Sequence, residues 1–113
     1  MKKSGIPHLT EALKLANEAA VHANDAYGPP PNADGGSCNF DSPSITFDKG
    51  TRRAYIEAAA LAAGVSVYRD TWGGYVFGMY SDGQGFRRTR SAEAAAAVLK
   101  AHGYRGHVRY MLD

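Results

Sequence analysis

The sequence has only one cysteine, Cys38, in 113 residues. One cysteine cannot form a disulfide within the chain and cannot by itself build a structural zinc site. The four histidines stand at no spacing that is typical of zinc ligands. We therefore expect a fold that depends on packing, without a metal or another cofactor.

Long apolar runs are also missing. No stretch approaches the roughly 20 apolar residues of a membrane-spanning helix, and the first residues, MKKSGIPHLTEALK, lack the continuous apolar segment of a signal peptide. We therefore expect a cytoplasmic protein with no membrane partner. Its hydrophobic fraction of 44% and its charged fraction of 21% are those of an ordinary globular chain, and its length fits one small domain.

Recognisable catalytic motifs are scarce. The glycine-rich segments GGYVFG and SDGQG match neither G-x-G-x-x-G nor G-x-x-x-x-G-K, so no phosphate-binding loop is expected. A nucleophilic role for Cys38 beside a histidine would need an encounter that the spacing does not predict. We therefore expect a non-enzymatic protein without catalytic residues, and an enzyme built on Cys38 or the histidines is the least favoured alternative.

Charged and aromatic residues are distributed unevenly. Residues 1–50 carry four Lys and six acidic residues, whereas residues 51–113 carry eight Arg, one Lys and five acidic residues. Nine of the twelve aromatic residues also lie in the second half. Because Arg and aromatic side chains are enriched at recognition surfaces, this half is the candidate for binding, although aromatic residues also gather where a core is.

The N-terminal part has the pattern of a helix. Residues 8–27 predict about five turns that begin after Pro7 or are capped by Thr10. The apolar stripe of this helix can pack on a domain but would be marginal in isolation. It consists of Leu9, Leu13, Ala16, Ala20 and Ala23.

A segment rich in Pro, Gly, Ser, Asn and Asp follows, GPPPNADGGSCNFDSPS at residues 28–44. This composition predicts a flexible loop. The loop divides the chain into an N-terminal helix, residues 1–27, and an α+β domain, residues 45–113.

The α+β domain opens with a strand and a helix. SITFD, residues 44–48, alternates as a short strand does. Residues 49–64 then predict an alanine-rich helix with Thr51 as its N-cap and Gly64 as its C-terminal stop.

After Gly64 the hydrophobic period changes from 3.6 to 2. This change predicts three strands, at residues 65–72, 75–81 and 85–90, joined by turns at Gly73-Gly74 and near Asp82-Gly83.

A second alanine-rich helix is predicted from Ser91, its N-cap, to Gly103, with Glu93 in its first turn. HVRYMLD, residues 107–113, can add a last strand. The predicted fold is therefore α+β, a small antiparallel sheet of three to five strands packed by two alanine-rich helices, with an extra N-terminal helix.

Strand geometry divides the predicted sheet into two faces. A two-residue turn at Gly73-Gly74 places Trp72 opposite Tyr75 and Tyr68 opposite Met79, on the face that the helices cover. The other face is then basic and rich in hydroxyl groups, which suits contacts with phosphates or base edges, or is an ordinary solvated surface. The residues that we expect to bind nucleic acid or another partner are Arg69, Thr71, Tyr80, Arg87, Arg88 and Arg90.

Residues 64–99 resemble the DNA-binding domains of the plant ethylene-response-factor type and the arm-binding domains of phage integrases. In those families a Trp-containing hairpin and a basic third strand precede a helix that opens with Ser or Thr followed by Glu-Ala-Ala. The order of elements is also similar to that of double-stranded-RNA-binding domains. The apolar-Gly segment that the DNA-binding families usually have on their third strand is absent here. This chain also adds a preceding helix, an early strand and a terminal strand. The match is carried by Trp72, Arg87, Arg88, Arg90, Ser91, Glu93, Ala94 and Ala95.

The favoured function is a small nucleic-acid-binding module that acts through the basic sheet face. The net charge of +2 is modest for binding that depends on counterion release. The alternative is an accessory inhibitor from a phage or plasmid that binds a protein partner, similar in size and in its lack of catalytic motifs to anti-CRISPR proteins. The arginine and tyrosine cluster would then be an interface hot spot, or the acidic N-terminal half would mimic nucleic acid.

Overall fold

The computed structural model describes residues 6–26, 41–71, 73–79 and 86–110. The predicted α+β class is confirmed. No helix within these ranges is long and apolar enough to cross a membrane. The described elements, in chain order, are α1 (Ile6–Ala26), β1 (Ser42–Thr46), α2 (Arg53–Ala63), β2 (Ser66–Arg69), β3 (Tyr75–Gly78), α3 (Phe86–Ala101) and β4 (Arg105–Arg109).

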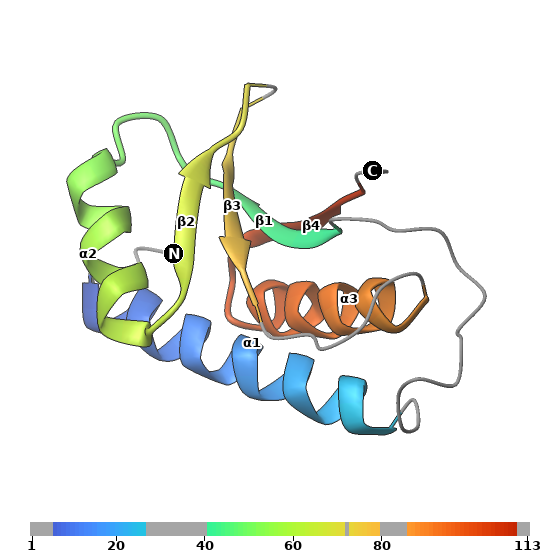
Figure 1. The fold of residues 1–113 in the computed structure, drawn as a ribbon. Coiled ribbons are helices and arrows are strands. Elements are labelled where there is room, and N and C mark those ends of the chain that lie inside the picture. Colours follow the sequence, from blue (N-terminus) through green and yellow to red (C-terminus); the bar gives the residue numbers. More distant parts are fainter. Residues whose placement is uncertain (1–5, 27–40, 72, 80–85, 111–113) are drawn as a thin grey trace.

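The four strands form one antiparallel sheet in the order β2-β3-β1-β4. Strands β1 and β3 lie at the centre, and β2 and β4 are the edges. From β1 onward the elements follow the β-α-β-β-α-β order of the split βαβ, or ferredoxin-like, arrangement (Figure 1). Because one fold serves many functions, this order describes the architecture and leaves the ligand open.

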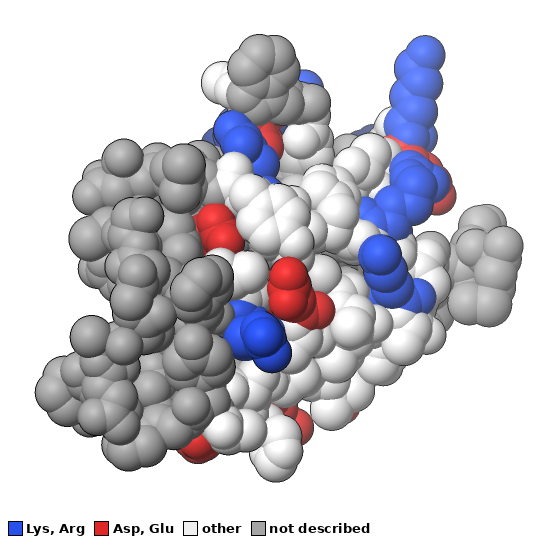
Figure 2. Space-filling model, turned by 90° about the vertical axis from the view of Figure 1, so that its right-hand side faces the viewer, with Lys and Arg blue, Asp and Glu red and all other residues white. Residues whose placement is uncertain are grey.

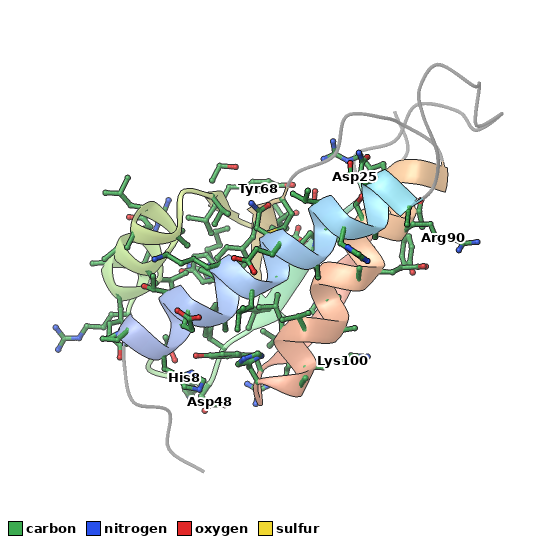
Figure 3. All side chains as sticks on the ribbon, turned by 90° about the horizontal axis from the view of Figure 1, so that it is seen from below. His8, Asp25, Asp48, Tyr68, Arg90 and Lys100 are labelled. Carbon is green, nitrogen blue, oxygen red and sulfur yellow. The ribbon has the colours of Figure 1, made fainter. Side chains whose placement is uncertain are left out.

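Helix α1 precedes this arrangement and packs into its core. It lies against both α3 and α2, and in the view from below it crosses between them (Figure 3). Its buried side chains share one hydrophobic cluster with Ile45 of β1 and Phe77 of β3. The predicted stripe is confirmed at four positions, each at most 3% exposed: Leu9, Leu13, Ala16 and Ala20.

The start of α1 differs from both predictions, because the helix begins before Pro7. The helix begins at Ile6, next to Pro7 and a full turn before Thr10, so the predicted Thr10 cap is wrong. The Thr10 hydroxyl instead donates to the carbonyl oxygen of Ala59 on α2, at 3.5 Å. The side chain therefore links two helices.

Helix α2 ends as predicted but begins differently. Gly64 has a left-handed φ of 78°, which glycine adopts without steric cost, and its N–H donates to the Leu61 carbonyl. At the other end the N-cap residue is Arg52, whose side chain makes no capping hydrogen bond. The Thr51 hydroxyl donates to the carbonyl of Asp48 at 2.7 Å, so the prediction of Thr51 as the cap is wrong.

The β2–β3 hairpin exists, but its register differs from the prediction. Val67 lies opposite Phe77 and Arg69 opposite Tyr75, so the connection runs over five residues, 70–74. The register is offset from the predicted one by three residues. Because an odd offset moves a strand's side chains to the opposite face, Val67 packs toward the core and Tyr68 lies on the outer face, 50% exposed.

Residues 85–90 do not form the predicted third strand. Helix α3 begins at Phe86, and β4 takes the sheet position beside β1. Arginine is a good helix former, and this segment runs directly into the alanine-rich stretch, so the helix extends back over it. Ser91, predicted as the N-cap, is therefore inside α3 and 2% exposed.

Two boundaries of the sheet also shift. Strand β1 begins at Ser42, inside the segment that was predicted to be a loop, and β4 begins at Arg105, two residues before the predicted last strand. Residues 28–40 of the predicted loop, including Cys38, lie outside the described residues.

Replacing Leu13 with Ala tests whether α1 belongs to the core. Because Leu13 is fully buried, we expect Leu13→Ala to lower the free energy of unfolding by about 2–5 kcal/mol. The matched control is Leu61→Ala, since Leu61 is 82% exposed, and should change it by less than about 0.5 kcal/mol. Urea unfolding followed by circular dichroism measures both values. Equal small effects would show that α1 does not pack as described.

Candidate functional site

The structure does not gather the predicted binding residues on one sheet face. Arg69 ends β2 and Thr71 lies in the hairpin connection, where both border a hollow of about 550 Å³. Tyr80 and the side chain of Arg87 lie outside the described residues. Arg88 and Arg90 belong to α3.

Arg88 is held in place by the fold. Its Nε donates to the Asp41 carbonyl at 3.0 Å and its Nη2 donates to the Ser42 hydroxyl at 3.2 Å. The adjacent Thr89 hydroxyl donates to the Asp41 carboxylate at 2.7 Å. These bonds fasten the start of α3 to the start of β1, so Arg88 has a structural role.

An ion pair spans the outer face of the sheet, from one edge to the other. Arg109 on edge strand β4 donates through Nε to the carboxylate of Asp70, which follows edge strand β2, at 2.7 Å. The two sheet edges therefore approach each other over this face. Between them Val76 and Ser44 are at most 1% exposed. This face is not the open basic platform that the alternation predicted.

Basic side chains gather instead at one end of the molecule. We call this group the basic end; it comes from the turn after β1, the start of α2, the end of α3 and the start of β4. Arg105 donates to the Asp48 carboxylate at 2.8 Å, and within the described ranges the other three cations have no carboxylate partner. Figure 2 shows blue side chains along the right margin beside a red one. The basic end consists of Lys49, Arg52, Lys100 and Arg105.

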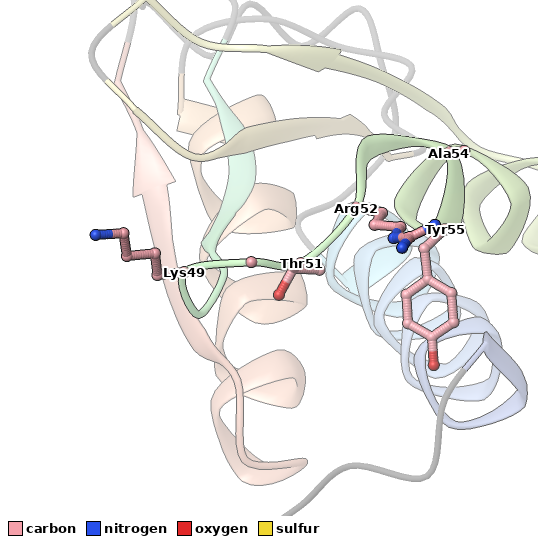
Figure 4. Close-up of a pocket in the computed structure, with 6 residues that line it drawn as sticks. Lys49, Thr51, Arg52, Ala54 and Tyr55 are labelled. Carbon is pink, nitrogen blue, oxygen red and sulfur yellow. The ribbon is translucent and has the colours of Figure 1, made fainter.

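An open hollow of about 660 Å³ adjoins the basic end (Figure 4). It lies where the turn after β1 leads into α2. The first N–H groups of α2 have no side-chain cap, so this helix end presents partial positive charge. The hollow therefore suits an anionic group such as a phosphate. It is lined by Lys49, Gly50, Thr51, Arg52, Ala54 and Tyr55.

Two histidines and a tyrosine lie at the same end. His8 of α1 and Tyr104, just before β4, share a hydrogen bond of 2.6 Å between Nδ1 and the phenol oxygen. The ring of His102, after α3, lies 6.4 Å from that of His8 between centroids, in an edge-on orientation. Figure 3 shows His8 and Asp48 at one end of the helices, with Arg90 toward the other.

Tyr104 anchors this cluster in the core. It is only 9% exposed, and its ring meets that of Phe47 edge-on at 6.2 Å. Burial, with a smaller contribution from nearby Tyr55, raises the pKa of Tyr104 to about 12. The phenol therefore keeps its proton at neutral pH and remains available for the hydrogen bond to His8.

The sequence interpretation missed this cluster, since His8 and Tyr104 are 96 positions apart. A local signal for the basic end was present in the run KGTRR, residues 49–53. Within the described ranges no three His, Cys, Asp or Glu side chains gather in a way that could hold a metal ion.

Comparisons with known proteins found no match among protein-family models, curated proteins or solved structures. The resemblance of residues 64–99 to DNA-binding domains therefore stays a prediction.

Arg88→Ala tests the structural role of Arg88. We expect this substitution to lower the free energy of unfolding by about 1.5–3 kcal/mol, because it leaves the Asp41 carbonyl and Ser42 without a charged donor. Arg90→Ala removes the same charge from an exposed position of the same helix and should change it by less than about 0.5 kcal/mol. Chemical denaturation measures both, and equal values would contradict the assignment.

Tyr104 makes stability depend on alkaline pH. The unfolded chain loses the phenol proton near pH 10 and the folded protein near pH 12, so unfolding releases a proton between these values and stability falls as the pH rises. We expect a loss of about 2 kcal/mol from this group across that window. Urea midpoints at pH 9 and 11 should therefore differ less for Tyr104→Phe than for the wild type. Tyr68→Phe, on an exposed ring, should keep the wild-type difference, and identical behaviour of both variants would refute the role of burial.

Proposed function

We propose that the protein binds nucleic acid through the sugar–phosphate backbone, at the basic end. The observation that carries this proposal is that Lys49 and Arg52 border one hollow at the uncapped start of α2, next to the ion pair of Arg105 with Asp48. Arg53, the next cation along α2, pairs with Glu57 at 2.7 Å and is not counted in the basic end. The local excess of positive charge is thus larger than the net charge of +2 suggests.

The start of α2 supports a phosphate rather than an arbitrary anion. Its uncapped N–H groups favour an oxyanion that accepts several hydrogen bonds, and Lys49 and Arg52 border the same hollow. Lys100 and Arg105 do not line this hollow, and in this proposal they contact neighbouring phosphates of the same strand. Several phosphates along one strand are what distinguishes nucleic acid from a small phosphorylated ligand.

Backbone contacts of this kind predict binding that weakens steeply with salt. Neutralising about four phosphates of a single strand gives a slope of about −3 for the logarithm of the binding constant against that of the salt concentration. Between 50 and 200 mM salt the affinity should therefore fall about 50-fold. Fluorescence anisotropy of labelled single-stranded DNA, single-stranded RNA and duplex DNA measures this dependence.

Variants that each remove one positive charge, either at the basic end or away from it, locate the binding surface. Arg52→Ala and Lys100→Ala should each weaken binding about 3- to 10-fold and make the salt slope less steep by about 0.7. Arg69→Ala and Arg90→Ala, which remove the same charge away from the basic end, should bind as the wild type does. Loss of binding in the second pair alone would move the surface to the residues predicted from the sequence, and absence of any binding at 50 mM salt would refute the function.

A second candidate is a protein-binding accessory inhibitor, as considered from the sequence. The observation that favours it is the exposure of Leu61 on α2 and Tyr68 on the adjacent β2, at 82% and 50%. Apolar and aromatic side chains at an accessible edge strand are typical of protein interfaces. This candidate predicts a complex that is weakened by Leu61→Ala and unaffected by Arg52→Ala, the reverse of the nucleic-acid prediction.

A further inference from the structure

The two histidines at this end each use Nδ1 in a hydrogen bond. His102 Nδ1 lies 2.9 Å from the carbonyl oxygen of Val98, and only a protonated Nδ1 can donate to a carbonyl. In neutral His102 the lone pair is therefore on Nε2. His8 uses Nδ1 for its bond to Tyr104. Within the described ranges Nε2 of both rings has no hydrogen-bond partner, and both rings are half-buried.

We infer that His8 and His102 form a general acid–base pair that cleaves the backbone of RNA. The inference rests on the proposed binding at the basic end and goes beyond a binding module. Ring centroids 6.4 Å apart bring the two imidazoles close enough to act on one phosphodiester. RNA fits a site with two proton-transfer groups, because its own 2′-hydroxyl is the nucleophile and no co-reactant is required.

We assign the two roles from the hydrogen bonds of the rings, with His102 as the base and His8 as the acid. Nε2 of neutral His102 takes the proton of the 2′-hydroxyl while the 2′-oxygen forms a bond to the adjacent phosphorus. The bond from phosphorus to the 5′-oxygen breaks, and this oxygen takes the Nε2 proton of the His8 imidazolium. The products are a 2′,3′-cyclic phosphate and a 5′-hydroxyl, and exchange with water returns both histidines to their starting states.

Tyr104 positions the acid. A protonated His8 donates through Nδ1 to the phenol oxygen, which stays uncharged because of its burial, and this bond orients the ring. Cations of the basic end stabilise the negative charge that develops on the phosphorane. Tyr104 contacts the pair directly and Tyr55 lies near Tyr104, while Asp48 and Arg105 pair with each other at the same end of the molecule (Figure 3).

The test uses the full chain and three labelled oligonucleotides: DNA, DNA with one ribonucleotide, and the same strand with a 2′-O-methyl group on that ribonucleotide. We expect cleavage only of the second, at the ribonucleotide, with a 2′,3′-cyclic phosphate identified by mass spectrometry. The rate should be bell-shaped in pH, since one imidazole must be neutral and the other protonated. Anisotropy with the 2′-O-methyl strand measures binding separately from cleavage.

Variants complete the experiment. His8→Gln and His102→Gln should each lower the cleavage rate by about 100-fold or more while the 2′-O-methyl strand still binds. His107→Gln, an equivalent change at an exposed position of β4, should leave the rate unchanged. Binding without cleavage, or cleavage that both substitutions leave intact, overturns this inference and leaves the proposed function standing. Absence of binding overturns both, and the pH profile of the wild type remains decisive if a variant fails to fold.

Discussion

The packing of α1 between α2 and α3 is the constraint on which the rest of the structure depends. Alanine at Ala12, Ala16 and Ala20 lets the helices approach closely, while Leu9 and Leu13 supply the larger apolar surface. A helix with this weakly apolar stripe is marginal alone, so its order comes from the partners on both sides. The packing of α1 also places His8 beside Tyr104 and thereby completes the candidate site.

Much of this fold could be predicted, because several elements are determined locally. The alanine-rich helices, the stop at Gly64 and the existence of the β2–β3 hairpin follow from period, propensity and turn chemistry. The predictions were wrong where contacts between residues far apart in the sequence determine the structure. The hairpin register depends on which residue of β2 meets the core, and the sequence around Gly73-Gly74 fits both a two-residue and a five-residue connection. Residues 86–90 became helix because β4 occupied the remaining place beside β1.

The candidate site was less predictable than the fold. Arg88 looked like a surface cation, but its guanidinium is used to join α3 to β1. The histidines looked unrelated because no short spacing links them, and the packing of α1 along α3 brings them together. The charged run at residues 49–53 indicated part of the basic end. The alternation in β2 was misleading, because the observed register of this strand differs from the predicted one.

The bond between His8 and Tyr104 joins positions separated by 96 residues. A contact of such long range is costly in loop entropy until the intervening elements are in place, so it forms late in folding. During synthesis on a ribosome His8 would therefore remain without this partner until Tyr104 had been made. The growing chain would carry the start of α1 without the contact that joins it to the segment after α3.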